Sequence, residues 1–260
     1  MKAKKSLGQN FLKSESALNK IVEAGDLSME DTVLEIGPGK GALTKKLLEK
    51  KVKVIAIEKD RELFALLSEK FEKELKNRNL VLVNDDILDL KTSVYDLKGG
   101  AYKIIANIPY NITGAIFKKF LTEKNQPERM ILMIQNEVAQ RILARDGRES
   151  ILSISVKAYG EPKMIVKVPS RYFSPSPKVD SAVFSITNIS RNMFRKNKIK
   201  EDVFWGIVKA GFAHKRKKLS SNLKSYVRRE NSSIINELGN KRAEELSLEE
   251  WINLAKSITE

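Results

Sequence analysis

The 260-residue sequence contains no cysteine and a single histidine. Without cysteine the chain cannot form disulfides, thiolate zinc sites or iron–sulfur clusters, and it cannot use a cysteine nucleophile. No stretch approaches the roughly 20 apolar residues that cross a bilayer, and the basic start at residues 1–6 is not followed by the apolar run of a signal peptide. We therefore expect a cytoplasmic protein that has neither a metal site nor a membrane partner.

Acidic residues are also scarce, with 33 Asp and Glu against 48 Lys and Arg and a net charge of +15. This balance favours a polyanionic partner, but composition alone does not distinguish DNA, RNA and a membrane surface. Most of the excess lies between Arg191 and Arg229, where apolar residues recur at helical spacing: Val203, Phe204, Ile207, Val208 and Phe212. We therefore expect a folded, amphipathic basic surface in this stretch.

Strand-like and helix-like segments alternate in the first part of the chain. Short apolar runs predict strands at residues 32–36, 52–57, 80–83, 103–106 and 130–134, with helices between them. Such alternation specifies a parallel sheet with helices on both faces. The runs at 163–168 and 181–187, joined by a proline-rich segment, predict an antiparallel hairpin at the sheet edge.

The sequence therefore predicts an α/β architecture in two domains. Residues 1–188 form a doubly wound, Rossmann-like domain with a mostly parallel, seven-stranded sheet that ends in the antiparallel hairpin. Residues 189–200 are a polar, basic connector, and the pattern beyond them is helical, ending with a capping box at residues 247–250. We expect residues 189–260 to form a small all-helical basic domain.

A glycine-rich turn at residues 37–41 (Gly-Pro-Gly-Lys-Gly) follows the predicted strand 32–36. Such a turn lets the backbone approach a ligand closely, and Glu58, at the end of the next strand, can accept both hydroxyls of a ribose. The glycine spacing is tighter than the dinucleotide fingerprint and no phosphate loop is present, which favours S-adenosylmethionine over NAD and ATP. The Asp86 carboxylate can accept a hydrogen bond from the adenine amine of the cofactor, although Asp85 is an equally acidic neighbour. A plain turn aspartate is a common alternative role for Asp86.

The segment Asn107-Ile108-Pro109-Tyr110 directly follows the predicted strand 103–106. Its place at a strand end beside the cofactor crevice disfavours a plain turn. An adenine amine is a poor nucleophile because its lone pair is delocalised into the ring. If the Asn107 side-chain oxygen and a backbone carbonyl near Pro109 accept hydrogen bonds from the two N–H groups of the adenine amine, the lone pair of its nitrogen faces the sulfonium methyl. Tyr110 offers a face for the base to stack on, worth roughly 1–3 kcal/mol.

Four segments resemble the ribosomal RNA adenine N6,N6-dimethyltransferases. They are residues 6–12 (SLGQNFL), 35–39 (EIGPG), 107–112 (NIPYNI) and 173–183 (FSPSPKVDSAV). The resemblance runs from residue 6 to the final helix. The last segment, with residues 212–219 (FAHKRKKL), is similar to the small-subunit branch. That branch usually has an arginine pair where this chain has Lys215-Arg216 or Arg216-Lys217.

The resemblance implies N6-dimethylation of two adjacent adenines in a loop near the 3′ end of small-subunit (16S) rRNA, during small-subunit biogenesis, with S-adenosylmethionine as methyl donor. It implies a cofactor site made by Asn10, Leu12, Gly37, Gly39, Glu58, Asp86 and Asn107. It implies that Asn107 and Pro109 orient the target amine and that Tyr110 and Phe173 sandwich the flipped base, although packing is the alternative for Phe173. We expect Lys215, Arg216, Lys217 and Lys218 to bind rRNA phosphates. We expect His214 to contact RNA rather than act as a general base.

Two other functions stay open at this stage. Large-subunit rRNA enzymes of the macrolide-resistance type share the chemistry, and a ribosome-assembly or nucleic-acid-binding factor could keep the fold with dispensable catalysis. The intact glycine turn and Asn107 segment favour an enzyme. The absence of cysteine excludes the pyrimidine C5 methyltransferases, which need a cysteine nucleophile, and the radical methylators, which need a cluster. We expect a monomer whose partner is the pre-small-subunit ribosomal particle.

Overall fold

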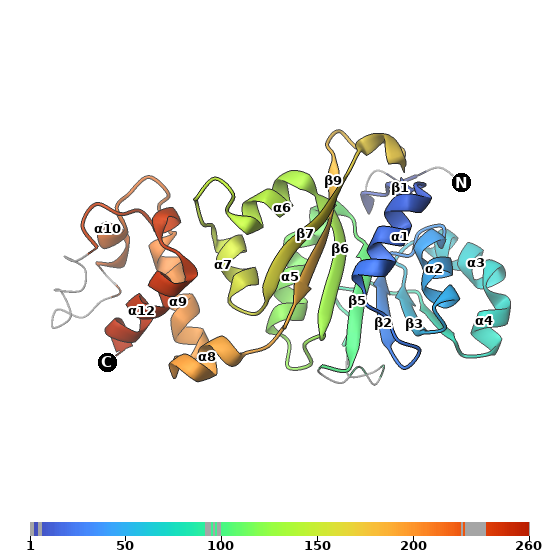
Figure 1. Cartoon of the computed structure of the whole chain (residues 1–260), viewed down its shortest axis with the longest axis horizontal. Coiled ribbons are helices and arrows are strands. Elements are labelled where there is room, and N and C mark those ends of the chain that lie inside the picture. The colour runs from blue at the N-terminus through green and yellow to red at the C-terminus, as the bar shows by residue number, and fades with distance from the viewer. Residues whose placement is uncertain are drawn as a thin grey trace. The chain divides into compact units, whose positions relative to one another are not determined.

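The computed structural model describes residues 3–4, 7–91, 95, 97, 100–224, 226 and 238–259. The chain divides into two compact units, one made of residues 1–139 and 161–189 and the other of residues 140–160 and 190–260 (Figure 1). The junction between residues 189 and 190 lies next to the expected domain boundary at residues 188 and 189. The second unit also includes residues 140–160, which the sequence analysis had placed in the first domain.

The first unit is built on a seven-stranded sheet of order β4-β3-β2-β5-β6-β9-β7. Its strands are β2 (Thr32–Ile36), β3 (Lys53–Ile57), β4 (Leu80–Val83), β5 (Tyr102–Asn107), β6 (Arg129–Gln135), β7 (Glu161–Val168) and β9 (Ser181–Thr187). The strands from β4 to β6 pair in parallel, and β9 is antiparallel to both β6 and β7. The predicted α/β sheet with an antiparallel edge is confirmed.

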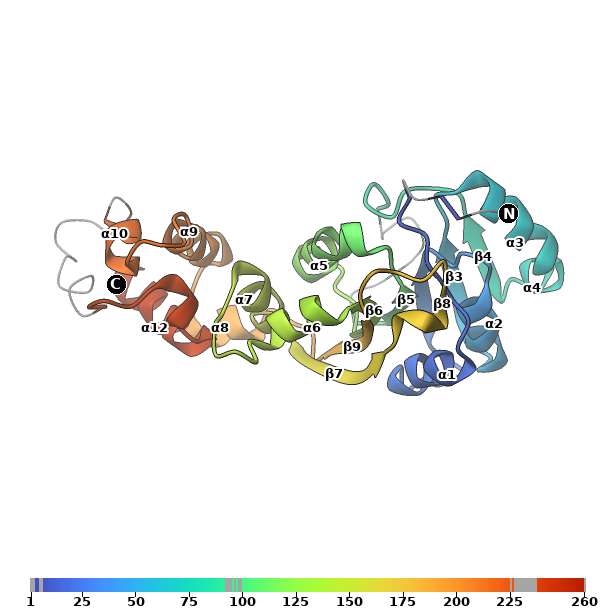
Figure 2. The same cartoon turned by 90° about the horizontal axis from the view of Figure 1, so that it is seen from above.

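Helices cover both faces of this sheet, which explains why most residues of its central strands are apolar. Figure 2 shows α1 and α2 on one face and α5 on the other. The helices of this unit are α1 (Glu15–Ala24), α2 (Ala42–Glu49), α3 (Arg61–Lys70), α4 (Glu72–Lys76) and α5 (Thr113–Thr122). Side chains cap two of these helices: the Ser14 side chain accepts from Ala17 N, and the Asp60 side chain accepts from Glu62 N.

A second, two-stranded sheet was not predicted. It pairs β1 (Phe11–Leu12) antiparallel with β8 (Phe173–Ser174), which follows the short 3₁₀ turn at Ser170–Tyr172. The Lys13 N–H extends this pairing by donating to the Tyr172 carbonyl at 2.8 Å. The N-terminal segment is thereby fixed beside the proline-rich loop that precedes β9.

The second unit is helical in its described residues. It contains the end of α6 (Asn136–Leu143), α7 (Ile151–Lys157), α8 (Asn192–Asn197), α9 (Glu201–Gly211), α10 (Leu219–Leu223), a 3₁₀ turn at Ala243–Glu245, and α12 (Leu248–Thr259). Trp251 is fully buried and stacks on Phe212 with ring centroids 5.5 Å apart. The Ser247 capping box forms as predicted, whereas α8 occupies the expected connector.

Residues 140–160 are tied into the second unit by polar and aromatic contacts. The Trp205 indole N–H donates to the Tyr159 hydroxyl at 3.0 Å, and that hydroxyl donates to the Glu201 carboxylate. Arg191 Nε pairs with the other oxygen of Glu201 at 2.9 Å.

None of the helices in the described part of the chain is long and apolar enough to cross a membrane.

Candidate functional site

A cavity of about 620 Å³ opens at the carboxyl ends of the parallel strands. Its lining includes the residues that follow β2, β3, β4 and β5. The chain order reverses between β2 and β5, because β3 and β4 extend the sheet on one side and β5 and β6 on the other. Ligands of open α/β folds bind at such a switch point, so this cavity is the candidate site.

The glycine turn after β2 adopts a backbone that only glycine adopts freely. Gly37 has φ +65° and Gly39 has φ +60°. A Cβ at Gly37 would meet only Pro109 Cδ, at 3.9 Å, while one at Gly39 would press on the Phe11 ring at 3.1 Å. The turn therefore leaves room between Gly37 and Pro109, and Phe11 closes it at Gly39.

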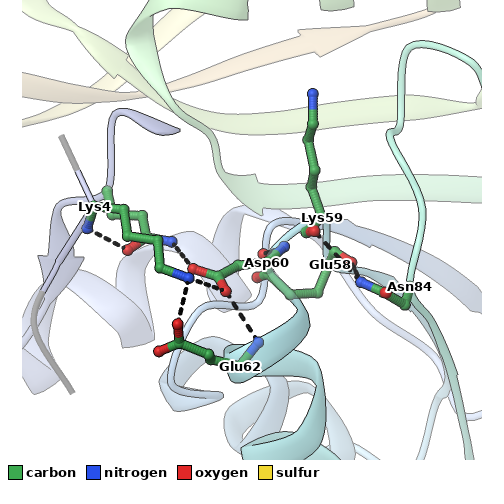
Figure 3. Close-up of polar contacts among 7 residues, drawn as sticks. Lys4, Glu58, Lys59, Asp60, Glu62 and Asn84 are labelled. Carbon is green, nitrogen blue, oxygen red and sulfur yellow. Dashed lines mark hydrogen bonds and ion pairs between the residues drawn. The ribbon is translucent and has the colours of Figure 1, made fainter. Parts of the chain in front are cut away.

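The Glu58 carboxylate is 6% exposed and lies between two backbone donors. Its Oε2 accepts from Gly39 N at 3.1 Å and its Oε1 from Asp60 N at 2.9 Å. Burial raises the pKa of Glu58. Figure 3 shows the Asn84 amide, which donates to the Glu58 backbone carbonyl at 2.8 Å. Each carboxylate oxygen accepts more than one hydrogen bond, so Glu58 keeps acceptor capacity for the two ribose hydroxyls predicted to bind there.

Asp86 and Asp85 both line the cavity. Asp86 Oδ1 accepts from Leu88 N at 2.9 Å, as a turn aspartate does, and Oδ2 pairs with Lys59 Nζ at 2.6 Å. Asp85 Oδ1 accepts from Asp86 N at 2.7 Å. The turn interpretation of Asp86 therefore holds in this structure, and its predicted contact with adenine stays a prediction.

The last residue of β5 and the segment after it bring three predicted residues to the same cavity. Asn107, Pro109 and Tyr110 all line it. Asn107 Nδ2 donates to the Asn10 carbonyl at 3.2 Å, which fixes the orientation of the amide and places its Oδ1 opposite that bond. The Tyr110 hydroxyl shares a hydrogen bond of 2.6 Å with Ser181 Oγ, and burial raises its pKa. The amide oxygen and the tyrosine ring are thereby held in fixed positions.

The structure does not bring Phe173 to the cavity. Its side chain is 3% exposed and belongs to the hydrophobic core, where its strand pairs with Leu12. Leu12 and Asn10 line the cavity, as does Ser174, the neighbour of Phe173. The predicted stacking of Phe173 on a target base therefore requires its side chain to leave the core.

The predicted RNA-binding residues lie in the second unit. Lys215, Arg216, Lys217 and Lys218 are all exposed, and none forms an ion pair with a described carboxylate. His214 is also exposed and does not line the cavity. Arg228 and Arg229 of the predicted basic stretch, and Ser6 of the first motif, lie outside the described residues.

Among described residues, no group of three or more His, Cys, Asp or Glu could hold a metal ion.

The sequence analysis missed Glu35 as a site residue. It lines the cavity at 1% exposure, and its Oε2 is buried without a hydrogen-bond partner among the described residues. Burial, together with the nearby charge of Glu58, raises the pKa of Glu35 to about 8. The signal was an acidic residue inside the otherwise apolar run Thr-Val-Leu-Glu-Ile, where an unpaired carboxylate is costly.

Solved structures share this fold over most of the chain. A dimethyladenosine transferase from Plasmodium falciparum superposes with a TM-score of 0.79 at 26% identity and covers 94% of this chain and 95% of its own. The 23S rRNA methyltransferase ErmE gives a TM-score of 0.75 at 25% identity and covers 96% and 100%. The sheet order, the cavity and these likenesses define a Rossmann-like methyltransferase.

The sequence comparisons narrow this class to one family. The model of the family described as ribosomal RNA adenine dimethylase matches residues 1–260. The chain is 41% identical over 262 residues to "Ribosomal RNA small subunit methyltransferase A" of Dehalococcoides mccartyi (strain CBDB1), covering 98% of this chain and 88% of the relative. The protein of that name from Fusobacterium nucleatum is 39% identical, with 98% and 97% covered. The chain belongs to the ribosomal RNA adenine dimethylase family.

The raised pKa of Glu35 predicts a pH-dependent stability. The folded state keeps a proton up to about pH 8 that the unfolded chain releases near 4.5, so Glu35 lowers the stability as pH rises through that window, by about 1.4 kcal/mol per pH unit. We expect Glu35→Gln to remove this part of the slope in ligand-free urea unfolding between pH 5 and 7.5. The exposed Glu72→Gln should run parallel to the unsubstituted protein, and a parallel curve for Glu35→Gln would contradict the assignment.

Proposed function

We propose that the chain transfers methyl groups from S-adenosylmethionine to the N6 amines of two adjacent adenines near the 3′ end of small-subunit rRNA, twice per adenine. The observation that carries this proposal is the convergence of the glycine turn, Glu58 and the Asn107 segment on one switch-point cavity. The family membership and the two relatives named as small-subunit methyltransferases support it.

The cavity residues fit the proposed cofactor. S-adenosylmethionine supplies an activated methyl group on a sulfonium and also carries an ammonium, so it favours acidic surroundings. The buried Oε2 of Glu35, which has no partner among the described residues, offers such an acceptor in the cavity lining. Glu58 would hold the ribose, Asp86 the adenine, and the space at Gly37 the methionine end. Asn10, Leu12 and Gly39 would complete the cofactor site.

The chemistry assigned to the Asn107 segment is orientation of the target amine. Asn107 Oδ1 would accept one amine hydrogen, and a carbonyl beside Pro109 would accept the other, which turns the nitrogen lone pair toward the methyl donor. The bond from Asn107 Nδ2 to Asn10 supports this role, because it fixes which end of the amide carries the acceptor. The amine proton can leave after transfer, so no strong base is needed.

Tyr110 provides the stacking face that the cavity presents in the ligand-free chain. The sandwich with Phe173 would form only when the Phe173 side chain turns out of the core. That movement would coincide with entry of the base. The Phe173 ring would then stack on the base, a contact worth roughly 1–3 kcal/mol.

The deciding experiment supplies methyl-labelled cofactor together with unmodified small-subunit particles, with naked 16S rRNA and with large-subunit RNA in separate reactions. We expect label in N6,N6-dimethyladenosine from small-subunit material after nuclease digestion. Label in large-subunit RNA only would overturn the assignment in favour of the macrolide-resistance type. Growth complementation by a methylation-inactive variant would instead support an assembly factor whose catalysis is dispensable.

Asn107→Ala should abolish methyl transfer while leaving cofactor binding largely intact. Loss of an acceptor that acts on the reacting group lowers kcat by about 100-fold or more. The Asn107 contact with Asn10 is only one of several that hold the N-terminal segment, so calorimetric affinity for the cofactor should change little. The exposed Asn79→Ala serves as the matched control. Cofactor affinity lost in parallel with kcat would contradict an orienting role.

Replacing Lys215, Arg216, Lys217 and Lys218 by glutamine should weaken rRNA binding and flatten its salt dependence. Each phosphate contact contributes about 0.7 to 0.9 to the slope of log K against log salt, so the slope should fall by up to about 3. Cofactor affinity should stay unchanged. A control with the same loss of charge replaces the exposed Lys50, Lys51, Lys73 and Lys76 of the first unit. Equal slopes for the two quadruple variants would rule out a specific grip.

A further inference from the structure

The N-terminal strap, defined here as Lys4 with residues 7–13, crosses the cavity and contacts its wall at three places. Its Asn10 carbonyl accepts from Asn107, and its β1 pairs with β8. A Cβ at Gly8 would lie 3.0 Å from Asn111 Oδ1 and 3.3 Å from Pro109 Cβ, so the strap also packs closely on the Asn107 segment. Residues 7–13 all line the cavity. The third contact, at Asp60, is on the opposite side, next to Glu58.

Asp60 joins the strap through both of its carboxylate oxygens. Oδ1 accepts from Lys4 Nζ at 2.8 Å, and Oδ2 accepts from Gln9 Nε2 at 2.8 Å. The Asp60 side chain is 2% exposed, and Lys4 Nζ also reaches Glu62 at 2.8 Å. Figure 3 shows Lys4 between Asp60 and Glu62, with Asp60 beside Glu58. Charge-assisted bonds of this kind are stronger than neutral ones, and their Asp60 end is buried, although Lys4 itself is 38% exposed.

The Gln9 amide has its direction fixed by two contacts. Its Nε2 donates to Asp60, and its Oε1 accepts from the backbone N of Lys4 at 2.8 Å. The Leu7 N–H donates to the Lys4 carbonyl at 3.1 Å, so both backbone groups of Lys4 are hydrogen-bonded within the strap. This arrangement depends on an acceptor at position 60, because a donor there would force the Gln9 amide to flip and release the Lys4 N–H.

Helix capping alone does not account for this arrangement. To cap α3, Asp60 needs only the bond from Glu62 N to Oδ1, at 3.0 Å, and asparagine caps equally well. Two further acceptor positions of this buried carboxylate are taken by the strap. The backbone N–H of the same residue donates to Glu58 Oε1 at 2.9 Å. One residue therefore touches both the proposed ribose carboxylate and the segment that covers the cavity.

We propose that Asp60 is a positioning residue that latches the strap, through Lys4 and Gln9, over the cofactor cavity and so sets the affinity for the cofactor. The latch itself rests on contacts within the chain, while its effect on affinity rests on the proposed function. The latch holds the strap on the Glu58 side and Asn107 holds it on the catalytic side. Release at Asp60 opens the cavity without altering Asn107.

The test uses Asp60→Asn, which keeps the helix cap and the side-chain shape but turns one acceptor into a donor facing Gln9. In the ligand-free protein, amide hydrogen exchange of peptides covering residues 7–13 should accelerate about 10-fold, the equivalent of about 1.4 kcal/mol. The dissociation constant for S-adenosylmethionine, measured by calorimetry, should rise by about the same factor. At saturating cofactor, kcat should stay near its original value, so KM for the cofactor carries the effect.

Lys4 variants separate the latch from a general loss of structure. Lys4→Met should weaken cofactor binding, as Asp60→Asn does. Lys4→Arg should keep the affinity of the unsubstituted protein, since an arginine can still donate to Asp60. The combined Asp60→Asn and Lys4→Met substitutions should fall short of additivity, because both break one contact. Lys76→Met removes an exposed lysine from a pair with Glu72 at 2.5 Å and should change neither exchange nor affinity.

The outcomes distinguish this proposal from the proposed function. Unchanged exchange of residues 7–13 in Asp60→Asn would overturn the latch, whatever the protein binds. Faster exchange with an unchanged dissociation constant would show that the strap does not set affinity and would also overturn the proposal. If the unsubstituted protein does not bind S-adenosylmethionine, the proposed function fails, and the exchange result still decides whether Asp60 holds the strap.

Discussion

The Glu58 carboxylate lies where three segments of the first unit meet, and the geometry of the cavity depends on it. One oxygen receives the N–H of Gly39 from the glycine turn and the other the N–H of Asp60 at the start of α3. Asp60 in turn holds Lys4 and Gln9 of the strap. A buried carboxylate without such donors would be costly. With them it is oriented before any ligand arrives, so binding requires little rearrangement of this side of the site.

At the other side of the cavity, position rather than proton transfer explains the proposed chemistry. The one histidine of the chain, His214, lies in the second unit and not in the cavity lining. The Tyr110 hydroxyl is hydrogen-bonded to Ser181, and burial raises its pKa. The Asn107 amide oxygen and the carbonyl beside Pro109 can accept hydrogen bonds from the target amine but cannot remove its proton. Accepting these bonds is sufficient if it holds the lone pair of the amine nitrogen in line with the methyl donor.

Sequence patterns predicted the features that depend on neighbouring residues. The runs at 32–36, 80–83 and 181–187 coincide with strands, and the capping box at residues 247–250 forms. The convergence of Glu58 and Asn107 followed from the rule that parallel strands end at one edge. The pairing of β1 with β8 was missed because two-residue strands carry no periodicity and the paired residues lie far apart in the chain, 161 positions for Leu12 and Phe173. The latch was missed for the same reason, since Lys4 and Asp60 meet only in the folded chain.

The charges of the two units suit ligands of opposite sign. Within the cavity the deeply buried ionisable groups are acidic, Glu35 and Glu58, while lysines of the lining such as Lys59 and Lys46 pair with carboxylates. Burial raises the pKa of Glu35 to about 8, so this carboxyl is neutral near pH 7, and an ammonium beside it would favour its ionised form. In the second unit, residues 215–218 are exposed and have no carboxylate partner among the described residues, so their field extends into solvent. Under the proposed function, the positive charge of the second unit, part of the net charge of +15, would attract rRNA phosphates. The cavity would then select by shape and hydrogen bonding which base reaches Tyr110.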